Sequence, residues 1–373
     1  MLALGLSGCT GSNSPSAPRA SDDISAAGAA ALPPLLPAAA SPAARATDAA
    51  LAQALDAELA KPQYEGLRSV IVLAHGRTAY ERYFDSRPTD RHQVWSVTKS
   101  VIGTLIGIAL AQGHLSSLDA TLDTLLPAYA DRMSPGQADV TLERLLTMSG
   151  GFISNPPGMD GQAGHDDWIA SLLEYSPEKP RNAFSYSNAT SHLLAAILEE
   201  ATGQSTLDYA RTVLFAPLGI ETEPAEEPVA SIDEVSALNG PAFGWATDPQ
   251  GRNLGPYGLR LRAQDLAKLG LLYLRDGAWE GRQVVPKQWV RAATRDRVDG
   301  DPAYGYQWWA DERGFAASGY GGQGIWVFPE DDLVFVSQVW IDPVTGNEQG
   351  VGDEVGKLFE STIYPAVAGP SST

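Results

Sequence analysis

A long apolar segment that directly follows a serine and a lysine is the feature that most limits how this chain can fold. Ser96 and Lys99 stand three residues apart, and residues 101–110 are almost all apolar or small. Apolar side chains at this density fit a helix of about a dozen residues that is buried on all sides, because a surface helix would carry one polar face. We therefore expect this helix to lie in the interior, with Ser96 at its start.

The spacing of the pair also has a chemical meaning. Side chains three apart lie on one face of a helix, so Lys99 can reach the Ser96 hydroxyl. A serine hydroxyl is a weak nucleophile until a base takes its proton, and a lysine can be that base if burial or a nearby cation lowers its pKa. The unpaired backbone N–H groups of the helix start would favour developing negative charge. The pair alone also fits an N-cap serine and an exposed lysine, so the rest of the chain has to decide.

Strand-like patterns occupy both ends of the chain. Residues 69–74 and 78–84 flank a hairpin signal at His75-Gly76-Arg77. After Tyr304 the pattern changes to alternating or continuous apolar runs, which is typical of strands. These later runs lie at residues 304–310, 315–319, 324–328 and 333–340.

Helical patterns occupy the middle of the chain and its margins. Residues from about 115 to 255 are mostly helical in pattern and rich in loops, and further helices are indicated at 47–60, with Thr47 or Asp48 as the N-cap, and at 262–275 and 351–364. Strands at both ends with helices between them predict an α/β (α+β) fold. We expect one antiparallel sheet built from both termini and flanked by helices, with an inserted all-helical subdomain.

The single cysteine, Cys9, ends the segment Leu6-Ser7-Gly8-Cys9, which resembles the lipobox of bacterial lipoproteins. By that resemblance Cys9 is lipidated, and Thr10 after it favours the outer membrane of the cell envelope. Residues 1–5 supply neither a positive n-region nor a full apolar h-region, so we expect the true start codon upstream. We divide the chain into a signal remnant (1–9), a disordered Ala/Pro/Ser-rich linker (10–46) and a folded hydrolase domain (47–373).

The charge balance excludes some partners. A formal net charge of −19 argues against nucleic acid and against electrostatic binding to anionic lipid. No later segment has the roughly 18 uninterrupted apolar residues of a membrane span, so we expect membrane attachment only through Cys9. One cysteine and five histidines without metal-ligand spacing predict no metal site and no cofactor. Most of the histidines are expected on the surface or in turns, and among nine tryptophans only Trp95 is expected near a site.

Two further segments carry chemistry. Tyr186 and Asn188 stand two apart just before a helical run. A tyrosine can act as a general base when nearby cations stabilise its phenolate, and an asparagine offers both a donor and an acceptor. In the second segment, Gly321 and Gly322 would let a ligand approach the backbone, and the N–H of Gln323 could then donate to an oxyanion.

Ser-x-x-Lys, Tyr-x-Asn and a glycine-rich strand entrance, in this order, resemble the serine β-lactamase and penicillin-binding-protein superfamily. The similarity is strongest to its class C-like branch, which contains class C β-lactamases, D,D-carboxypeptidases, esterases and 6-aminohexanoate-dimer hydrolases. It extends from about residue 68 to residue 367 and implies a β-lactamase/transpeptidase-like fold.

The resemblance implies a role for each matching residue. Ser96 would be the acylated nucleophile and Lys99 its partner, while Tyr186 would be the general base that also protonates the leaving group. Asn188 would contact the substrate carbonyl or amide. The segment Tyr320-Gly321-Gly322 aligns with the Lys/His-Thr/Ser-Gly motif of the superfamily, so the backbone N–H groups of Ser96 and Gln323 would form the oxyanion hole.

One departure bears on the substrate. Tyr320 stands where β-lactamases and D,D-peptidases place a lysine or histidine that helps to bind a substrate carboxylate, and a tyrosine cannot replace that charge. We therefore expect a periplasmic serine hydrolase that cleaves a small, uncharged or weakly charged ester or amide. A β-lactamase or D,D-carboxypeptidase is one alternative, and a non-catalytic penicillin-binding-like sensor is another. An α/β-hydrolase is excluded because the chain has no Gly-x-Ser-x-Gly.

Overall fold

The computed structural model describes residues 35–36, 41–154, 166–175, 183–230, 240, 242–298, 302–341 and 351–368. Cys9, the leader and most of the expected linker therefore lie outside the described residues. His165 also lies outside them.

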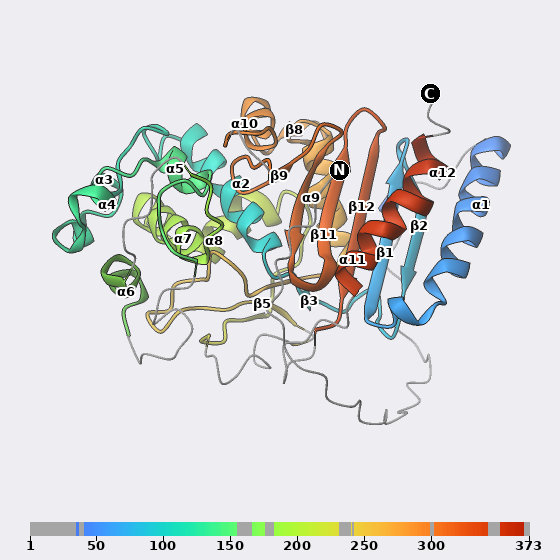
Figure 1. Ribbon diagram of the computed structural model, residues 1–373, viewed down its shortest axis with the longest axis horizontal. Helices are drawn as coiled ribbons and strands as arrows, with labels where there is room; N and C mark the ends of the chain where they lie inside the picture. The colour runs from blue at the N-terminus through green and yellow to red at the C-terminus, as the bar shows by residue number, and fades with distance from the viewer. Residues whose placement is uncertain are drawn as a thin grey trace.

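A six-stranded antiparallel sheet is built from both ends of the chain, as predicted (Figure 1). Its strand order is β2-β1-β12-β11-β10-β9. The N-terminal hairpin joins the C-terminal strands where β1 pairs with β12, with Ile71 opposite Val336. The strands are β1 (Leu67–Ala74), β2 (Arg77–Tyr83), β9 (Trp309–Ala310), β10 (Phe315–Gly319), β11 (Gln323–Phe328) and β12 (Leu333–Val339).

Both faces of this sheet are covered by helices. Val70 and Val72 of β1 belong to an apolar cluster with α1 (Pro42–Leu59) and α11 (Val351–Leu358). Ile71 and Leu73 point to the opposite face and join the main core with α2 (Val97–Ala111) and α9 (Ala263–Leu274). This alternation is the period-two pattern of a strand that is buried on both sides.

The first helix begins earlier than its sequence pattern suggested. α1 starts at Pro42, and its N-cap is Ser41, whose side chain accepts a hydrogen bond from the Ala44 N–H at 3.1 Å. The prediction of Thr47 or Asp48 as the cap was wrong. A proline is compatible with the first helical position because the N–H that it lacks would have no partner there.

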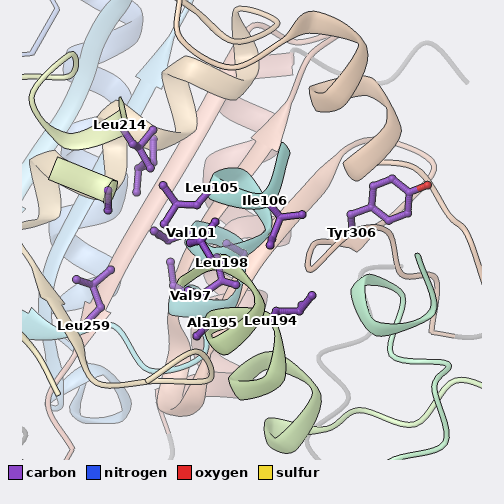
Figure 2. Close-up of a cluster of buried hydrophobic side chains, with 14 of the residues drawn as sticks. Val97, Val101, Leu105, Ile106, Leu194, Ala195, Leu198, Leu214, Leu259 and Tyr306 are labelled. Carbon is purple, nitrogen blue, oxygen red and sulfur yellow. The ribbon is translucent and has the colours of Figure 1, made fainter. Parts of the chain in front are cut away.

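The helix after Ser96 is interior, as expected. Residues 97–109 are all buried in α2. Figure 2 shows side chains of α2 and α7 (Asn188–Thr202) in one apolar cluster. Two glycines allow this packing: Gly107 leaves room for the Trp289 ring, and a Cβ on Gly103 would lie 2.8 Å from the Tyr306 carbonyl oxygen.

The inserted region is mainly helical, but it also contributes strands. A four-stranded sheet of order β3-β6-β5-β4 contains β4 (Ala225–Glu226) and β5 (Phe243–Trp245) from the insertion, so the region is not all-helical. Strands of two or three residues are too short to show a period of two in the sequence. The partner strands are β3 (His92–Gln93) and β6 (Leu259–Leu261).

The remaining elements are short. The insertion holds α3 (Leu122–Leu125), α4 (Pro135–Ala138), α5 (Leu142–Leu146), α6 (Trp168–Tyr175) and α8 (Thr206–Ala210). Further on lie the hairpin of β7 (Ala278–Trp279) and β8 (Arg282–Gln283), then α10 (Lys287–Ala293) and α12 (Tyr364–Ala368). Short 3₁₀ or π segments occur at Pro62–Tyr64, Pro127–Arg132, Arg211–Phe215, Tyr320–Gly322 and Phe359–Ile363.

The strand expected at residues 304–310 is mostly a turn. Only Trp309–Ala310 is a strand, and the N–H of Gly305 donates to the Trp308 carbonyl at 2.8 Å. Gln307 has a positive φ of 63° inside this turn. The apolar residues of the segment are buried by the turn itself, so their spacing imitated a strand. Across the described part of the chain, no helix has both the length and the apolar content needed to span a membrane.

Candidate active site

Ser96 lies where β3 passes into α2. The Val94 N–H donates to the Leu259 carbonyl at 2.9 Å and fixes the approach to the helix. Trp95 then adopts a positive φ of 48°, and Ser96 follows as the N-cap with φ −69°. A non-glycine residue in the left-handed region is uncommon and points to a turn that the surroundings hold in place. This turn puts the Ser96 side chain at the N-terminal end of a buried helix.

Lys99 makes the contact that its spacing predicted. Its Nζ lies 2.9 Å from the Ser96 Oγ, within hydrogen-bond distance. It donates to the Asn188 Oδ1 at 2.7 Å and to the Pro256 carbonyl at 3.1 Å. Lys99 is only 1% exposed, and burial lowers the pKa of its ammonium well below the ordinary value. All three partners are neutral, so nothing in this set offsets the cost of burying the charge.

Tyr186 lies beside this pair, just before α7. The Lys99 Nζ lies 4.8 Å from the centroid of its ring, and the ring stacks on Trp309 at 5.3 Å. Burial raises the pKa of the Tyr186 phenol well above its ordinary value, against a smaller opposing effect of its hydrogen bond with Ser96. Since the pKa of Lys99 falls and that of Tyr186 rises, a neutral amine with a neutral phenol is favoured over an ammonium with a phenolate.

Asn188 is the first residue of α7, so the start of a second buried helix meets the start of α2. The N-cap Ser187 holds that start: its hydroxyl accepts from the Thr190 N–H at 3.1 Å and donates to the Ile153 carbonyl at 2.8 Å. This cap directs the Asn188 side chain at Lys99.

The glycine-rich segment is arranged differently from the sequence prediction. Gly319, the last residue of β10, is the one that approaches the nucleophile: a Cβ there would lie 3.2 Å from the Ser96 nitrogen and 2.5 Å from the Val94 carbonyl oxygen. Tyr320, Gly321 and Gly322 form the turn to β11, where both glycines have a positive φ. A Cβ on Gly322 would face Gly352 and Val355 of α11 instead of the site.

Gln323, predicted to give the second oxyanion donor, starts β11 opposite Gly319. Its side chain is buried, donates to the Val339 carbonyl and accepts from the Val339 N–H at 3.2 Å. The structure thus places Gly319 against the backbone of Ser96, and the role of the Gln323 backbone N–H stays a prediction.

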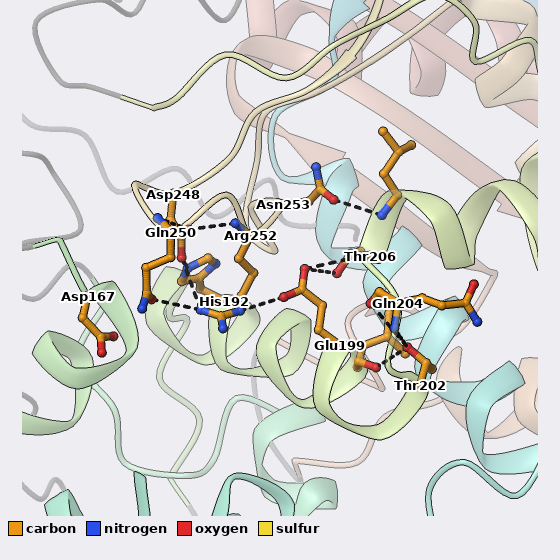
Figure 3. A network of polar contacts seen from close by, with 12 residues as sticks. Asp167, His192, Glu199, Thr202, Gln204, Thr206, Asp248, Gln250, Arg252 and Asn253 are labelled. Atoms are coloured by element: carbon orange, nitrogen blue, oxygen red, sulfur yellow. Dashed lines mark hydrogen bonds and ion pairs between the residues drawn. The ribbon is translucent and has the colours of Figure 1, made fainter. Parts of the chain in front are cut away.

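A polar network that the sequence did not reveal holds the segment that carries Pro256 (Figure 3). His192 of α7, expected on the surface or in a turn, is fully buried, and its Nε2 lies 3.1 Å from the Asp248 Oδ2. Arg252 continues the network, with its Nε 2.9 Å from the Glu199 Oε2 and its Nη1 3.4 Å from Asp248. Gly255 packs directly on the Ser191 carbonyl of α7, where no Cβ would fit.

Gln307 forms hydrogen bonds with both α2 and α7. Its backbone carbonyl accepts from the Ser100 Oγ at 2.6 Å, and its Oε1 accepts from the Ser191 Oγ at 2.8 Å. Its Nε2 donates to the Leu146 carbonyl at 2.9 Å. Gln307 therefore links α2 and α7 next to Lys99. Neither Gln307 nor His192 lies in a motif of the sequence, because their partners are distant along the chain.

No metal cluster is found among the residues that the structure describes, where no group of three or more His, Cys, Asp or Glu side chains could hold an ion. The site therefore consists of Ser96, Lys99, Tyr186 and Asn188, brought together from α2 and from the start of α7. Such a set can activate a hydroxyl for attack on a carbonyl carbon and can return a proton to a leaving group.

Comparisons with known proteins identify the family of the chain. The family model described as Beta-lactamase matches residues 51–339. The chain is 25% identical over 295 residues to the 6-aminohexanoate-dimer hydrolase of Paenarthrobacter ureafaciens, covering 71% of this chain and 70% of that protein. It is 30% identical over 208 residues to penicillin-binding protein 4 of Amycolatopsis lactamdurans, covering 52% of this chain and 53% of the relative.

Solved structures show the same fold. The class C β-lactamase of Rhodobacter sphaeroides superposes with a TM-score of 0.58 at 21% sequence identity, over 84% of this chain and 99% of that one. At this identity the likeness concerns the fold, and the chemistry of the site has to be argued from its residues.

Proposed function

Because the chain belongs to the β-lactamase family of serine hydrolases, we propose that it cleaves an uncharged ester or amide through an acyl-enzyme on Ser96. The observation that carries the proposal is the 2.9 Å contact between the Lys99 Nζ and the Ser96 Oγ in a buried site. A lysine whose pKa is lowered by burial can take the serine proton, whereas an exposed lysine would stay charged.

In the proposed reaction, the Ser96 Oγ attacks the substrate carbonyl carbon while its proton passes to the neutral Lys99 amine. The carbonyl oxygen becomes an oxyanion, which backbone N–H groups stabilise. When the tetrahedral intermediate collapses, the bond to the leaving group breaks and Tyr186 gives that group a proton, which it regains from Lys99. Water then attacks the acyl-enzyme by the reverse proton path and releases the acid.

We propose the Ser96 N–H as one oxyanion donor. The sequence suggested Gln323 for the second donor, but the approach of Gly319 to Ser96 favours the end of β10 and the turn that follows it. A backbone donor there would lie beside the nucleophile because Gly319 has no side chain to separate the two strands of backbone.

The charge environment supports an uncharged substrate. Burial is the main cause of the pKa shifts of Lys99 and Tyr186, and the side-chain and backbone groups in hydrogen-bond contact with Lys99 are all neutral among the described residues. Tyr320 occupies the segment where a substrate carboxylate would need a cation. A β-lactam or a peptide with a terminal carboxylate would therefore bind without a counter-charge. The name of the Paenarthrobacter relative supports an amide bond as the scissile bond, although the linear 6-aminohexanoate dimer carries a terminal carboxylate and would itself lack a counter-charge here.

The experiment is intact-mass analysis of the full chain after incubation with a fluorophosphonate, in parallel with turnover assays. The assays use p-nitrophenyl esters, the linear 6-aminohexanoate dimer and a chromogenic cephalosporin. The Ser96→Ala variant should lose the adduct and the turnover, and Ser361→Ala, which changes a serine on the exposed side of a C-terminal segment, should keep both. Efficient cephalosporin turnover would favour a β-lactamase, and absence of any adduct or turnover would favour the sensor.

We also propose that Cys9 carries a lipid that anchors the protein in the cell envelope of a bacterium. The support is the segment Leu6-Ser7-Gly8-Cys9 together with the Ala-, Pro- and Ser-rich residues that separate it from α1. A lipid on this cysteine would hold the hydrolase at the outer membrane, facing the periplasm.

A further inference from the structure

Three aromatic residues are next in sequence to Ser96 or to a residue that contacts Ser96 or Lys99. Trp95 directly precedes Ser96, Tyr257 directly follows Pro256, and Tyr320 directly follows Gly319. The Pro256 carbonyl accepts a hydrogen bond from Lys99, and Gly319 packs on the Ser96 backbone. Each ring therefore belongs to a neighbour of Ser96, Pro256 or Gly319. The Trp95 ring lies edge-on to Tyr320 at 5.4 Å and 6.4 Å from Tyr257. We name Trp95, Tyr257 and Tyr320 the first aromatic cluster.

A second aromatic cluster, made of Phe184, Tyr186, Tyr304 and Trp309, lies on the side of the general acid. Trp309 stacks on Tyr186 at 5.3 Å and lies 6.1 Å from Phe184 and 4.9 Å from Tyr304. Trp309 was not expected near the site. Within the described part of the chain, ring contacts join members of each cluster but do not join the two clusters. The two clusters are therefore separate groups of rings, one that includes the neighbour of Ser96 and one that includes Tyr186.

The first aromatic cluster is partly open to solvent. Trp95 and Tyr257 are partly exposed, and Tyr320 is 36% exposed. Among the described residues, Tyr320 and Val229 are the large apolar side chains that are exposed. Covering aromatic surface with another apolar group is favourable because it removes that surface from water. Rings prefer to pack edge-on or offset against other rings. An uncharged planar group beside Ser96 would supply that cover.

The chemistry of the site assigns each cluster to one half of the substrate. Tyr186 gives its proton to the leaving group, so the leaving atom lies at the second aromatic cluster. The acyl carbon is bonded to the Ser96 Oγ in the acyl-enzyme, and Trp95 of the first cluster directly precedes Ser96, so we place the acyl substituent against the first cluster. This argument rests on the proposed function.

We infer that Trp95, Tyr257 and Tyr320 bind the acyl half of the substrate and that this half carries an uncharged aromatic ring. The enzyme would then be selective for arylacyl esters or amides. The same three residues would discriminate against an acyl chain that ends in a carboxylate, because the negative faces of the rings offer no counter-charge.

The experiment varies the acyl group while the leaving group stays p-nitrophenol. The full chain is assayed with the acetate, phenylacetate and cyclohexylacetate esters and with the succinate monoester. Phenylacetate and cyclohexylacetate differ little in size, so their ratio of kcat/KM reports aromaticity separately from apolar bulk. We expect phenylacetate to be preferred over cyclohexylacetate by about tenfold, the effect of one or two favourable ring contacts. The succinate monoester should be the poorest substrate.

The variants are Trp95→Leu, Tyr257→Leu and Tyr320→Leu, each compared by the ratio of phenylacetate to cyclohexylacetate. Each should lower that ratio by about threefold or more, whatever common factor it imposes on both esters. Tyr364→Leu is the matched control, because Tyr364 is also a partly exposed tyrosine in ring contact with a phenylalanine but belongs to α12. It should leave the ratio unchanged.

The outcomes separate the two proposals. If no ester is turned over in a Ser96-dependent way, the proposed function fails. If the esters are turned over but phenylacetate and cyclohexylacetate are equivalent, or the ratio survives in all three variants, the proposed function stands and the aromatic acyl site is overturned.

Discussion

The backbone carbonyl of Pro256 accepts a hydrogen bond from the Lys99 Nζ at 3.1 Å, although the two residues are 157 positions apart. This contact joins the insertion to the nucleophile helix. Since the acceptor is a neutral carbonyl, it orients the lysine without stabilising its charge as a carboxylate would. Residues from two distant parts of the chain therefore surround the Lys99 amine and determine its orientation and its pKa.

Lys99→Met should lower kcat/KM by about 10²-fold to 10⁴-fold, because it removes the base from a site that otherwise keeps its volume. In the wild-type protein, kcat/KM should fall as the pH drops through the lowered pKa of Lys99, since only the neutral amine accepts the serine proton. The pH profile should therefore reach its plateau well below pH 10.5, the ordinary lysine value. Near-normal rates in Lys99→Met would contradict the mechanism.

Tyr186→Phe should lower the rate most for substrates with poor leaving groups. The phenol, whose pKa burial raises, gives its proton to the leaving group, and p-nitrophenolate leaves readily without one. We expect a loss of about 10²-fold or more for an alkyl ester or anilide and a clearly smaller loss for the p-nitrophenyl ester of the same acid. Equal losses for both would show that Tyr186 does not act on the leaving group.

Gly319→Ala should impair acylation more than folding. Its Cβ would lie 2.5 Å from the Val94 carbonyl oxygen and 3.2 Å from the Ser96 nitrogen, so the start of α2 or the end of β10 must shift. A misplacement of this order can cost about 10²-fold in rate. The rate of fluorophosphonate labelling, measured beside the urea midpoint, tests this. Wild-type labelling would show that the approach of Gly319 to Ser96 has no role in the reaction.

The protein should lose stability in mild acid through two histidines. Burial lowers the pKa of His192, and it lowers the pKa of His92 to about 4. Both side chains then bind protons more readily in the unfolded chain, so stability falls as the pH drops below the unfolded value near 6.5. Urea midpoints at pH 7.5 and pH 5 should differ less in His92→Gln than in the wild type.

His192→Gln tests the second histidine in the same assay and should also reduce the difference, while lowering the midpoint at pH 7.5 by disturbing the contact with Asp248. His114→Gln, at an exposed position, is the control. An unchanged difference between the two pH values in both buried variants would assign the acid sensitivity to other groups.

Cys9→Ala should release the protein from membranes. In bacterial cells that express the full chain with an upstream signal sequence, the wild type should fractionate with membranes and incorporate labelled palmitate, because one or two acyl chains on the cysteine hold it there. The variant should appear in the soluble fraction without label. Membrane association of Cys9→Ala would place the anchor elsewhere.

The sequence by itself determined the local part of this protein. The contact between Ser96 and Lys99 follows from the helical repeat, and the density of apolar residues after them predicted the buried helix that carries both. The apolar run at residues 69–74 likewise predicted a strand, and the structure shows that neighbouring side chains of β1 are buried on opposite faces because of the backbone period.

Only the tertiary structure decided which distant residues complete the site. The approach of Gly319 to Ser96 depends on which residue of a hairpin meets α2, and the contact of Lys99 with Pro256 depends on a network around His192 and Asp248. Such contacts arise from the packing of whole elements and have no period along the chain. The sequence therefore specified the contact between Ser96 and Lys99, and packing specified the groups that hold, orient and desolvate them.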